Sequence, residues 1–217
     1  MGRYKLAVFD LDGTILDTTE GVLSAVKYTI QKKKLPPLSD SRLASFIGPP
    51  IQDSFAGAYG LSGEILQELA TVFRDRYKGE DLLKAAPYEG IYQVFDTLKE
   101  REIVPAVATY KREDYALELL RHYRFHEYCP VMHGADHENR LKKQDIIRLC
   151  MEETGVTDCR EVVMIGDTVH DASGAEKLGV DFVGVTYGFG FRGPEDFDGV
   201  RHIGTADCAA DILKWIK

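Results

Sequence analysis

The clearest pattern in the chain is a series of short apolar runs, each of which ends at a polar residue or a glycine. Runs of four to six residues bounded in this way predict buried strands of a parallel sheet. Amphipathic segments with apolar residues every three to four positions lie between them and predict helices. From residue 91 onward strand and helix alternate, which indicates a doubly wound parallel α/β sheet. The predicted strands are 6–9, 103–108, 130–133, 162–165 and 182–185, and the predicted helices are 91–101, 115–123, 143–154, 171–178 and 209–216.

Residues 18–84 show a different pattern, because helical periodicity continues there without a strand-like run. Proline and glycine divide this segment into several pieces. The predicted helices are 18–34, 39–46, 51–58 and 64–78. We interpret the chain as an α/β core domain, residues 1–16 and 86–217, into which an α-helical domain, residues 17–85, is inserted.

The end of the first predicted strand carries the most distinctive chemistry. Asp10 and Asp12 follow the apolar run directly, and Gly13 then breaks the strand. Residues two apart in an extended backbone point the same way, so the two carboxylates are expected side by side. Like charges that close repel, and they stay ionised together only when a cation lies between them. This stretch therefore predicts a bound metal, a shared proton, or both.

Polar groups also follow the ends of two other predicted strands. Thr109 offers a hydroxyl and, with Tyr110, backbone N–H groups that suit an anion. Asp167 and Asp171 lie at a strand-to-helix turn, although a helix N-cap would explain Asp171 equally well. Because the carboxyl ends of parallel strands share one edge, we expect these groups to meet the carboxylates of the first strand. Such an oxygen-rich cluster suits a hard cation such as Mg²⁺.

Two lysines, Lys142 and Lys143, open the predicted helix 143–154. Positive charge is unfavourable at the positive end of a helix. We therefore expect one of the two lysines to have an anionic partner.

Composition limits the classes of protein to which the chain can belong. The chain has 217 residues, of which 44% are hydrophobic and 29% charged, as is usual for soluble proteins. Its net charge of −8 argues against a general nucleic-acid binder, which would carry a basic face. No run approaches the roughly 18 apolar residues that span a membrane, and with only a few apolar residues after a basic start, residues 1–9 are not expected to act as a secretory signal. The four cysteines form no Cys-x-x-Cys pair, so we expect free thiols and a cytoplasmic location.

Four motifs stand out along the chain: Asp10-Leu11-Asp12-Gly13-Thr14, Thr109 after Ala106-Val107-Ala108, a lysine before Asp145-Ile146-Ile147, and Gly166-Asp167 with Asp171. In their order, and in the elements on which they lie, they resemble the four motifs of the haloacid dehalogenase superfamily. Over its whole length the chain resembles a phosphatase of this superfamily, with a Rossmann-like core. The inserted helices resemble the α-helical cap of one subfamily, and Gly48-Pro49-Pro50 resembles the cap loop of phosphoglycolate-phosphatase-like members. The third motif lacks the common Lys-Pro-x-Pro form, and we prefer Lys143, two residues before Asp145, over Lys142.

The resemblance implies a phosphoric monoester hydrolase that uses Mg²⁺ and forms an aspartyl-phosphate on Asp10. Asp12 would protonate the leaving alkoxide and then deprotonate the attacking water. A carboxylate at position 12 also favours phosphoryl transfer over dehalogenation, because a halide leaves without a proton. Thr109 and Lys143 would hold the phosphoryl oxygens. The implied metal-binding residues are Asp10, Asp12 through its main-chain carbonyl, and Asp167. Asp171 would act through a bound water or by contacting one of the direct ligands.

The substrate is expected to be a small soluble phosphate ester. Phosphoglycolate is the first choice on cap resemblance, followed by nucleoside 5′-monophosphates and sugar phosphates. A sugar phosphomutase of the β-phosphoglucomutase type shares the first motif and is an alternative within enzymes. A non-catalytic phosphate-binding module is the alternative outside them, disfavoured because a binder needs no nucleophile paired with an acid. The expected substrate-binding residues are Thr109, Tyr110, Lys143 and Gly48, and the chain is expected to be a monomer or homodimer.

Two further features leave alternatives open. The segment Tyr187-Gly188-Phe189-Gly190 after the last predicted strand is either a rim near the site or a surface loop. His133, His137 and His170 lie near predicted strand ends, but their spacing does not indicate a zinc site.

Overall fold

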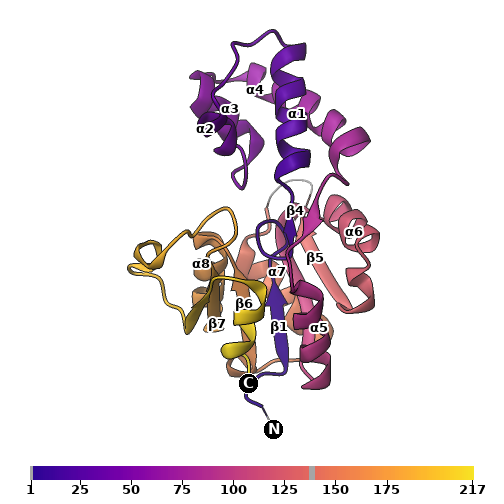
Figure 1. Ribbon diagram of the computed structural model, residues 1–217, viewed down its shortest axis with the longest axis vertical. Coiled ribbons are helices and arrows are strands. Elements are labelled where there is room, and N and C mark those ends of the chain that lie inside the picture. The colour runs from indigo at the N-terminus through magenta and orange to yellow at the C-terminus, as the bar shows by residue number, and fades with distance from the viewer. Residues whose placement is uncertain (1, 137–139) are drawn as a thin grey trace. The chain divides into compact units, whose positions relative to one another are not determined.

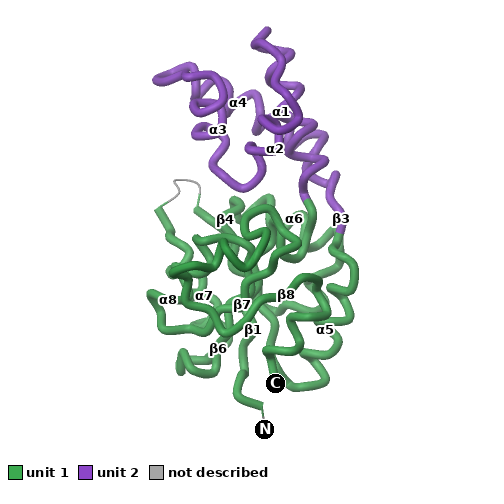
Figure 2. The backbone as a smooth tube through the Cα atoms, turned by 60° about the vertical axis from the view of Figure 1, so that its left-hand side comes forward, with its two compact units in different colours: residues 1–17, 87–217 green, residues 18–86 purple. Residues whose placement is uncertain are grey.

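The computed structural model of the chain describes residues 2–136 and 140–217, so His137 lies outside the described residues (Figure 1). The chain divides into two compact units (Figure 2). Unit 1 comprises Met1–Asp17 and Pro87–Lys217, and unit 2 comprises Thr18–Ala86. The chain passes between the units twice, and at these passages two short strands, β2 (Leu16–Asp17) and β3 (Ala86–Pro87), pair with each other.

A six-stranded parallel sheet forms the centre of unit 1, in the order β5-β4-β1-β6-β7-β8. The strands are β1 (Leu6–Phe9), β4 (Val104–Arg112), β5 (Val131–Ala135), β6 (Val162–Gly166), β7 (Asp181–Val185) and β8 (Gly204–Ala206). Phe9 at the end of β1 is in register with Val107 of β4 and Ile165 of β6. The order of the strands reverses around β1, and ligands bind beyond the carboxyl ends of the strands at such a point. The doubly wound parallel sheet predicted from the sequence is thus confirmed.

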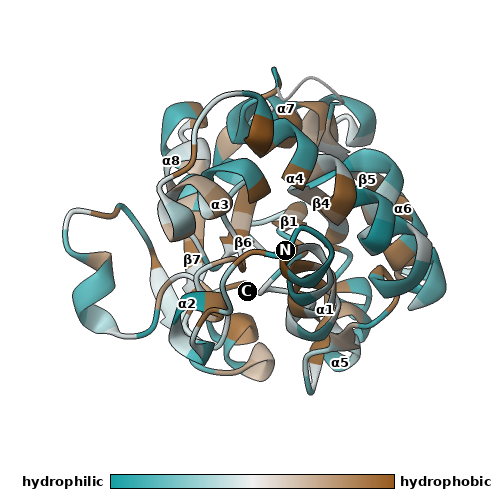
Figure 3. Ribbon diagram, turned by 90° about the horizontal axis from the view of Figure 1, so that it is seen from above, coloured by the Kyte–Doolittle hydropathy of each residue, from teal (hydrophilic) through white to brown (hydrophobic). Residues whose placement is uncertain are grey.

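Helices cover both faces of this sheet, because alternate residues of each strand point to opposite sides. The helices are α5 (Ile91–Glu100), α6 (Glu113–His122), α7 (Lys143–Thr154) and α8 (Val169–Leu178). Leu6 and Val8 of β1 belong to a buried cluster with Ile146 of α7. Phe9 packs on the other side against Phe95 of α5, with ring centroids 4.9 Å apart. The outward side of α6 is largely polar, as Figure 3 shows in teal.

The remaining elements of unit 1 are short. In the described part of this unit, 3-10 segments join or end the main elements at Phe125–Glu127, Cys159–Glu161, Pro194–Phe197 and Ala209–Lys214. The closing helix predicted over 209–216 is therefore a shorter 3-10 segment. Among the described residues, none of the helices combines the length and the apolar character that crossing a membrane requires.

Unit 2 is helical throughout its main elements, α1 (Thr19–Lys32), α2 (Asp40–Ala44), α3 (Ile51–Tyr59), α4 (Glu64–Arg76) and a π-helical turn at Tyr77–Asp81. The turn brings the buried carboxylate of Asp81 against three donors: Ser24 at 2.9 Å, Arg76 at 2.9 Å and Lys84 at 2.7 Å. Burial alone would raise the pKa of Asp81, but these hydrogen bonds outweigh it and lower the pKa. A buried charge network therefore ties the last turn of unit 2 to α1.

Candidate active site

Three carboxylates meet at the carboxyl edge of the sheet in unit 1. Asp10 follows β1 and Asp167 follows β6, while Asp171 lies in the first turn of α8. One ligand oxygen from each of the three lies within 4.8 Å of the others, and all three residues are buried. The backbone N–H of Asp10 donates to the carbonyl of Ile165 at 2.9 Å, which continues the pairing of β1 with β6 past the end of the strand. The sheet itself therefore sets the spacing between the first and the fourth motif.

Lys143 supplies the positive charge of this cluster. It is the first residue of α7, and its ammonium nitrogen lies 2.6 Å from Oδ1 of Asp10 and 2.7 Å from Oδ1 of Asp171. It also donates to the carbonyl of Ala108 at 2.9 Å. Gly174 of α8 leaves room for the lysine stem, since a Cβ there would lie 2.7 Å from Cγ of Lys143. The neighbouring Lys142 is exposed, so the structure brings only the second lysine of the pair to the carboxylates.

Asp171 serves two partners with its two oxygens. Oδ2 accepts from the backbone N–H of Thr168 at 3.0 Å and from its hydroxyl at 2.7 Å, while Oδ1 faces Lys143. Thr168 is the N-cap residue, and Asp171 is the third helical residue, reaching back to it. Asp171 is therefore not the N-cap residue itself; it caps the helix from the third helical position, by accepting from the N-cap residue Thr168. Gly166 makes this arrangement possible, because a side chain there would collide with the Asp171 carboxyl.

The loop after β7 holds Asp167. Oδ2 of Asp167 accepts from the backbone N–H of Phe189 at 2.7 Å and of Gly190 at 3.1 Å. On its other side the hydroxyl of Thr14 lies 3.5 Å from Oδ1. Gly188 allows the loop to approach, since a Cβ at 188 would overlap the backbone of Gly13. The segment 187–190 is thus a wall of the site and not a remote surface loop.

Thr109 and Tyr110 lie where β4 leaves its regular pairing with β5. The register shifts between Ala108 and Arg112, and Thr109 and Tyr110 both belong to the irregular stretch between them. The Thr109 hydroxyl accepts the backbone N–H of Lys111 at 3.1 Å, which leaves its own proton for another acceptor. The Tyr110 hydroxyl accepts the backbone N–H of Lys143 at 2.9 Å, so this residue supports the start of α7.

Asp12 is not one of the three clustered acids, and its carboxylate faces a lysine that the sequence motifs did not indicate. Its Oδ1 lies 2.9 Å from the ammonium nitrogen of Lys111. Position 111 follows the second motif by two residues, and this spacing is the only signal by which the sequence could have indicated it.

Burial and mutual repulsion shift the pKa values of the clustered groups. Burial raises the pKa of Asp10 well above its ordinary value, Lys143 opposes this, and Asp171 and Asp167 reinforce it. Burial, followed by the charge of Asp171, also raises the pKa of Asp167, to about 6. For Lys143 burial would lower the pKa, but Asp10 and Asp171 outweigh burial and raise it. Ionised together, three carboxylates facing one ammonium form an all-oxygen site with excess negative charge, which fits a hard divalent cation.

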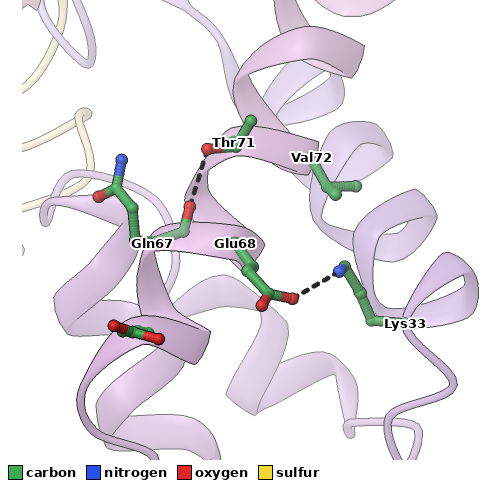
Figure 4. Close-up of a pocket in the computed structure, with 6 residues that line it drawn as sticks. Lys33, Gln67, Glu68, Thr71 and Val72 are labelled. Carbon is green, nitrogen blue, oxygen red and sulfur yellow. Dashed lines mark hydrogen bonds and ion pairs between the residues drawn. The ribbon is translucent and has the colours of Figure 1, made fainter.

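Unit 2 has two features that could concern binding, a predicted residue and a surface hollow. Gly48 has a φ of +103°, and among the described residues other than its two chain neighbours no heavy atom lies within 4 Å of the place where its Cβ would be, so its role in substrate binding stays a prediction. A surface hollow between the end of α1 and α4 is lined by Lys33, Glu64, Gln67, Glu68, Thr71 and Val72 (Figure 4). Lys33 there is paired with Glu68 at 2.9 Å, a type of exposed ion pair that needs no ligand.

Comparison with known proteins agrees with this geometry. Residues 7–185 match the family model for haloacid dehalogenase-like hydrolases. A 5′-nucleotidase of Pseudomonas aeruginosa is 32% identical over 87% of this chain and 85% of its own length. A phosphoglycolate phosphatase of Agrobacterium fabrum is 30% identical over 85% of this chain and 81% of its own. A crystal structure described as a predicted phosphatase from Clostridium acetobutylicum superposes with a TM-score of 0.83, at 31% identity over 97% of this chain and 99% of that one. The chain therefore belongs to the haloacid dehalogenase-like hydrolase family, as a phosphatase of small phosphate substrates.

Proposed function

We propose that the chain hydrolyses a small organic phosphate monoester with Mg²⁺, through an aspartyl-phosphate on Asp10. The observation that carries this proposal is the contact of Lys143 with Asp10 at 2.6 Å beside two further buried carboxylates. A lysine held against a nucleophilic carboxylate at a sheet edge can bind the phosphoryl oxygens that the nucleophile attacks.

The proposed reaction has two displacements at phosphorus. Asp10 attacks, the bond from phosphorus to the ester oxygen breaks, and its electron pair moves to the leaving oxygen, which takes a proton from Asp12. Asp12 then deprotonates a water, which attacks the aspartyl-phosphate, releases inorganic phosphate and restores the carboxylate of Asp10. Throughout, the hydroxyl of Thr109 and the ammonium of Lys143 hold the phosphoryl oxygens in place.

The proposed metal site uses the carboxylates of Asp10 and Asp167 and the main-chain carbonyl of Asp12, with Asp171 acting through water. Two backbone N–H groups already fix one oxygen of Asp167, so its carboxylate is oriented in advance. A bound Mg²⁺ would supply positive charge opposite the phosphoryl oxygens and relieve the repulsion among the buried acids.

For the substrate, we propose phosphoglycolate first and a nucleoside 5′-monophosphate second. The name of the Agrobacterium relative supports the first, and the name of the Pseudomonas relative supports the second. Sugar phosphates, a sugar phosphomutase activity and a non-catalytic phosphate-binding role follow as further alternatives. Each of these makes a different product, or none, so one set of assays separates them.

The test measures phosphate release from p-nitrophenyl phosphate with Mg²⁺ and with excess chelator, followed by phosphoglycolate, AMP and hexose phosphates. We expect turnover with Mg²⁺, none with chelator, and a phosphate adduct on Asp10 in acid-quenched protein. Conversion of a hexose 1-phosphate to the 6-phosphate would favour the phosphomutase. No turnover of any ester by folded, Mg²⁺-binding protein would overturn the enzymatic proposal.

A further inference from the structure

The side chain of Lys111 lies inside the site, against Asp12. Its ammonium nitrogen is 2.9 Å from Oδ1 of Asp12, and the exposed fractions of the two side chains are 9% and 22%. Lysine is rarely buried without a partner, because removing its charge from water is costly. The pair therefore differs from a solvated surface ion pair, which contributes little to structure.

The backbone holds Lys111 in this place by a specific irregularity of the sheet. Ala108 of β4 pairs with His133 of β5, and pairing resumes only at Arg112 with Ala135, so β4 contains two extra residues. Bulges of this kind redirect side chains. Gly134 allows the bulge to pack on β5, because a Cβ there would lie 2.6 Å from the carbonyl oxygen of Lys111.

The same bulge links Lys111 to the second motif. The backbone N–H of Lys111 donates to the Thr109 hydroxyl at 3.1 Å, while the Lys111 side chain contacts Asp12. One residue thus contacts both the hydroxyl expected to bind phosphate and the carboxyl expected to move the proton. A shift of Lys111 would therefore move both the Thr109 hydroxyl and the Asp12 carboxylate.

We propose that Lys111 is a positioning residue for Asp12, an inference that rests on the proposed function. When the ester bond breaks, the leaving oxygen takes the proton of Asp12, and Asp12 becomes a carboxylate. The ammonium of Lys111 then neutralises the new charge and fixes the carboxylate in one orientation until it accepts a proton from water. Lys111 itself forms no bond to the substrate and gives up no proton.

The test uses two esters of similar shape whose leaving groups differ in basicity. Benzyl phosphate releases a strongly basic alkoxide that needs a proton, whereas p-nitrophenyl phosphate releases a weakly basic phenolate that does not. The parameter compared is kcat/KM, which covers the steps up to departure of the leaving group and excludes later hydrolysis of the aspartyl-phosphate. The variants are Lys111→Met, which keeps the length of the side chain, and Lys111→Arg, which keeps the charge.

In Lys111→Met we expect kcat/KM for benzyl phosphate to fall about 10- to 100-fold and that for p-nitrophenyl phosphate to fall less than about threefold. Lys111→Arg should recover much of the loss. Inhibition by inorganic phosphate should not change, because the phosphoryl contacts remain. The matched control is Lys177→Met on the exposed end of α8, which removes the same charge far from Asp12 and should leave both esters unaffected.

Two results in correctly folded Lys111→Met would overturn the inference. An equal loss for both esters would mean that Lys111 does not act through the proton of Asp12. Weaker inhibition by inorganic phosphate would mean that Lys111 binds the phosphoryl group directly. A folded, Mg²⁺-binding wild-type chain that hydrolyses neither these two esters nor phosphoglycolate, AMP or the hexose phosphates would instead overturn the proposed function itself, so the two failures are distinguishable.

Discussion

The ammonium nitrogen of Lys143 lies 2.6 Å from Oδ1 of Asp10, although the two residues are separated by 133 positions in the sequence. Both side chains are almost fully buried. Removal of one partner of a buried ion pair leaves the other charge without compensation, which costs far more than the loss of a surface pair. The pair therefore connects folding stability to the proposed chemistry.

The two adjacent lysines should respond very differently to truncation. We expect Lys143→Ala to lower kcat/KM by about 10²- to 10³-fold, because it removes a positive charge proposed to face the phosphoryl oxygens. It should also lower the free energy of unfolding by about 3–5 kcal/mol, because buried carboxylates lose their counter-charge. Lys142→Ala, at the exposed neighbour, is the control and should change kcat/KM less than about twofold. A larger loss for Lys142→Ala would transfer the phosphate-binding role to that residue.

Asp10→Asn should fold but lose turnover by at least about 10³-fold, because the amide cannot form the acyl-phosphate bond. Mg²⁺ should bind more weakly, since one of the three clustered carboxylates is lost. Acid-quenched variant incubated with substrate should carry no phosphate adduct in a mass spectrum, whereas the wild type should. Activity near that of the wild type would remove Asp10 from the role of nucleophile.

The pH dependence of stability should reveal the raised pKa of Asp167. Its pKa is about 6 in the folded chain and about 3.9 when unfolded, so the folded state holds this proton more tightly. The resulting stability is present in full below about pH 4 and is lost as the pH rises through about 6. We therefore expect metal-free Asp167→Asn to exceed the wild type in free energy of unfolding by about 1–3 kcal/mol at pH 7.5.

Urea denaturation with chelator, repeated from pH 4 to pH 8, measures this difference. The advantage of Asp167→Asn should fade toward pH 4, where the wild-type carboxyl is protonated as well. Added Mg²⁺ at pH 7.5 should stabilise the wild type more than the variant, because the ionised carboxylate is a proposed ligand. An advantage that does not vary with pH would show that titration of Asp167 is not its source.

Gly174→Ala tests whether the Lys143 side chain needs the space that Gly174 leaves beside its stem. A Cβ at 174 would lie 2.7 Å from Cγ and 2.9 Å from Cβ of Lys143, and neither atom is at the flexible end of the side chain. We expect kcat/KM to fall about tenfold or more and the free energy of unfolding to fall by about 1–3 kcal/mol. Gly57→Ala is the matched control, since among the described residues a Cβ there meets no heavy atom within 4 Å outside its own helix backbone and chain neighbours. The control should raise helix stability by up to about 1 kcal/mol, and equal losses in the two variants would contradict the steric argument.

Much of the fold could be predicted from the sequence, because buried parallel strands are nearly continuous apolar runs. The first strand occupies the predicted residues, and the helix at 143–154 begins and ends where predicted. The strand β8 escaped prediction because Gly-Thr-Ala offers three small residues and no apolar run. The π-helical turn at Tyr77–Asp81 was not predicted either, because the apolar periodicity used for the predicted helix 64–78 does not distinguish a π-helical turn from an α-helical one.

The candidate site also has one part that the sequence predicts and another that it does not. Its acids follow strand ends, so the topology of the sheet brings them together from positions that the sequence displays. The donors to Asp167 are backbone N–H groups of Phe189 and Gly190, and backbone groups leave no mark in the residue types. The place of the Lys111 side chain depends on a bulge in β4, and the pattern of apolar and polar residues does not reveal such a bulge.

The pairing of β2 with β3 has a consequence for how such enzymes diversify. Because these strands are hydrogen-bonded neighbours, the two ends of the inserted segment 18–86 leave the α/β unit at one place. A single exchange at that place can replace the entire segment by one from another family member without cutting any strand of the six-stranded sheet. The segment can thus be exchanged as one piece, and chimeras joined at residues 17–18 and 86–87 would keep every strand of the six-stranded sheet intact.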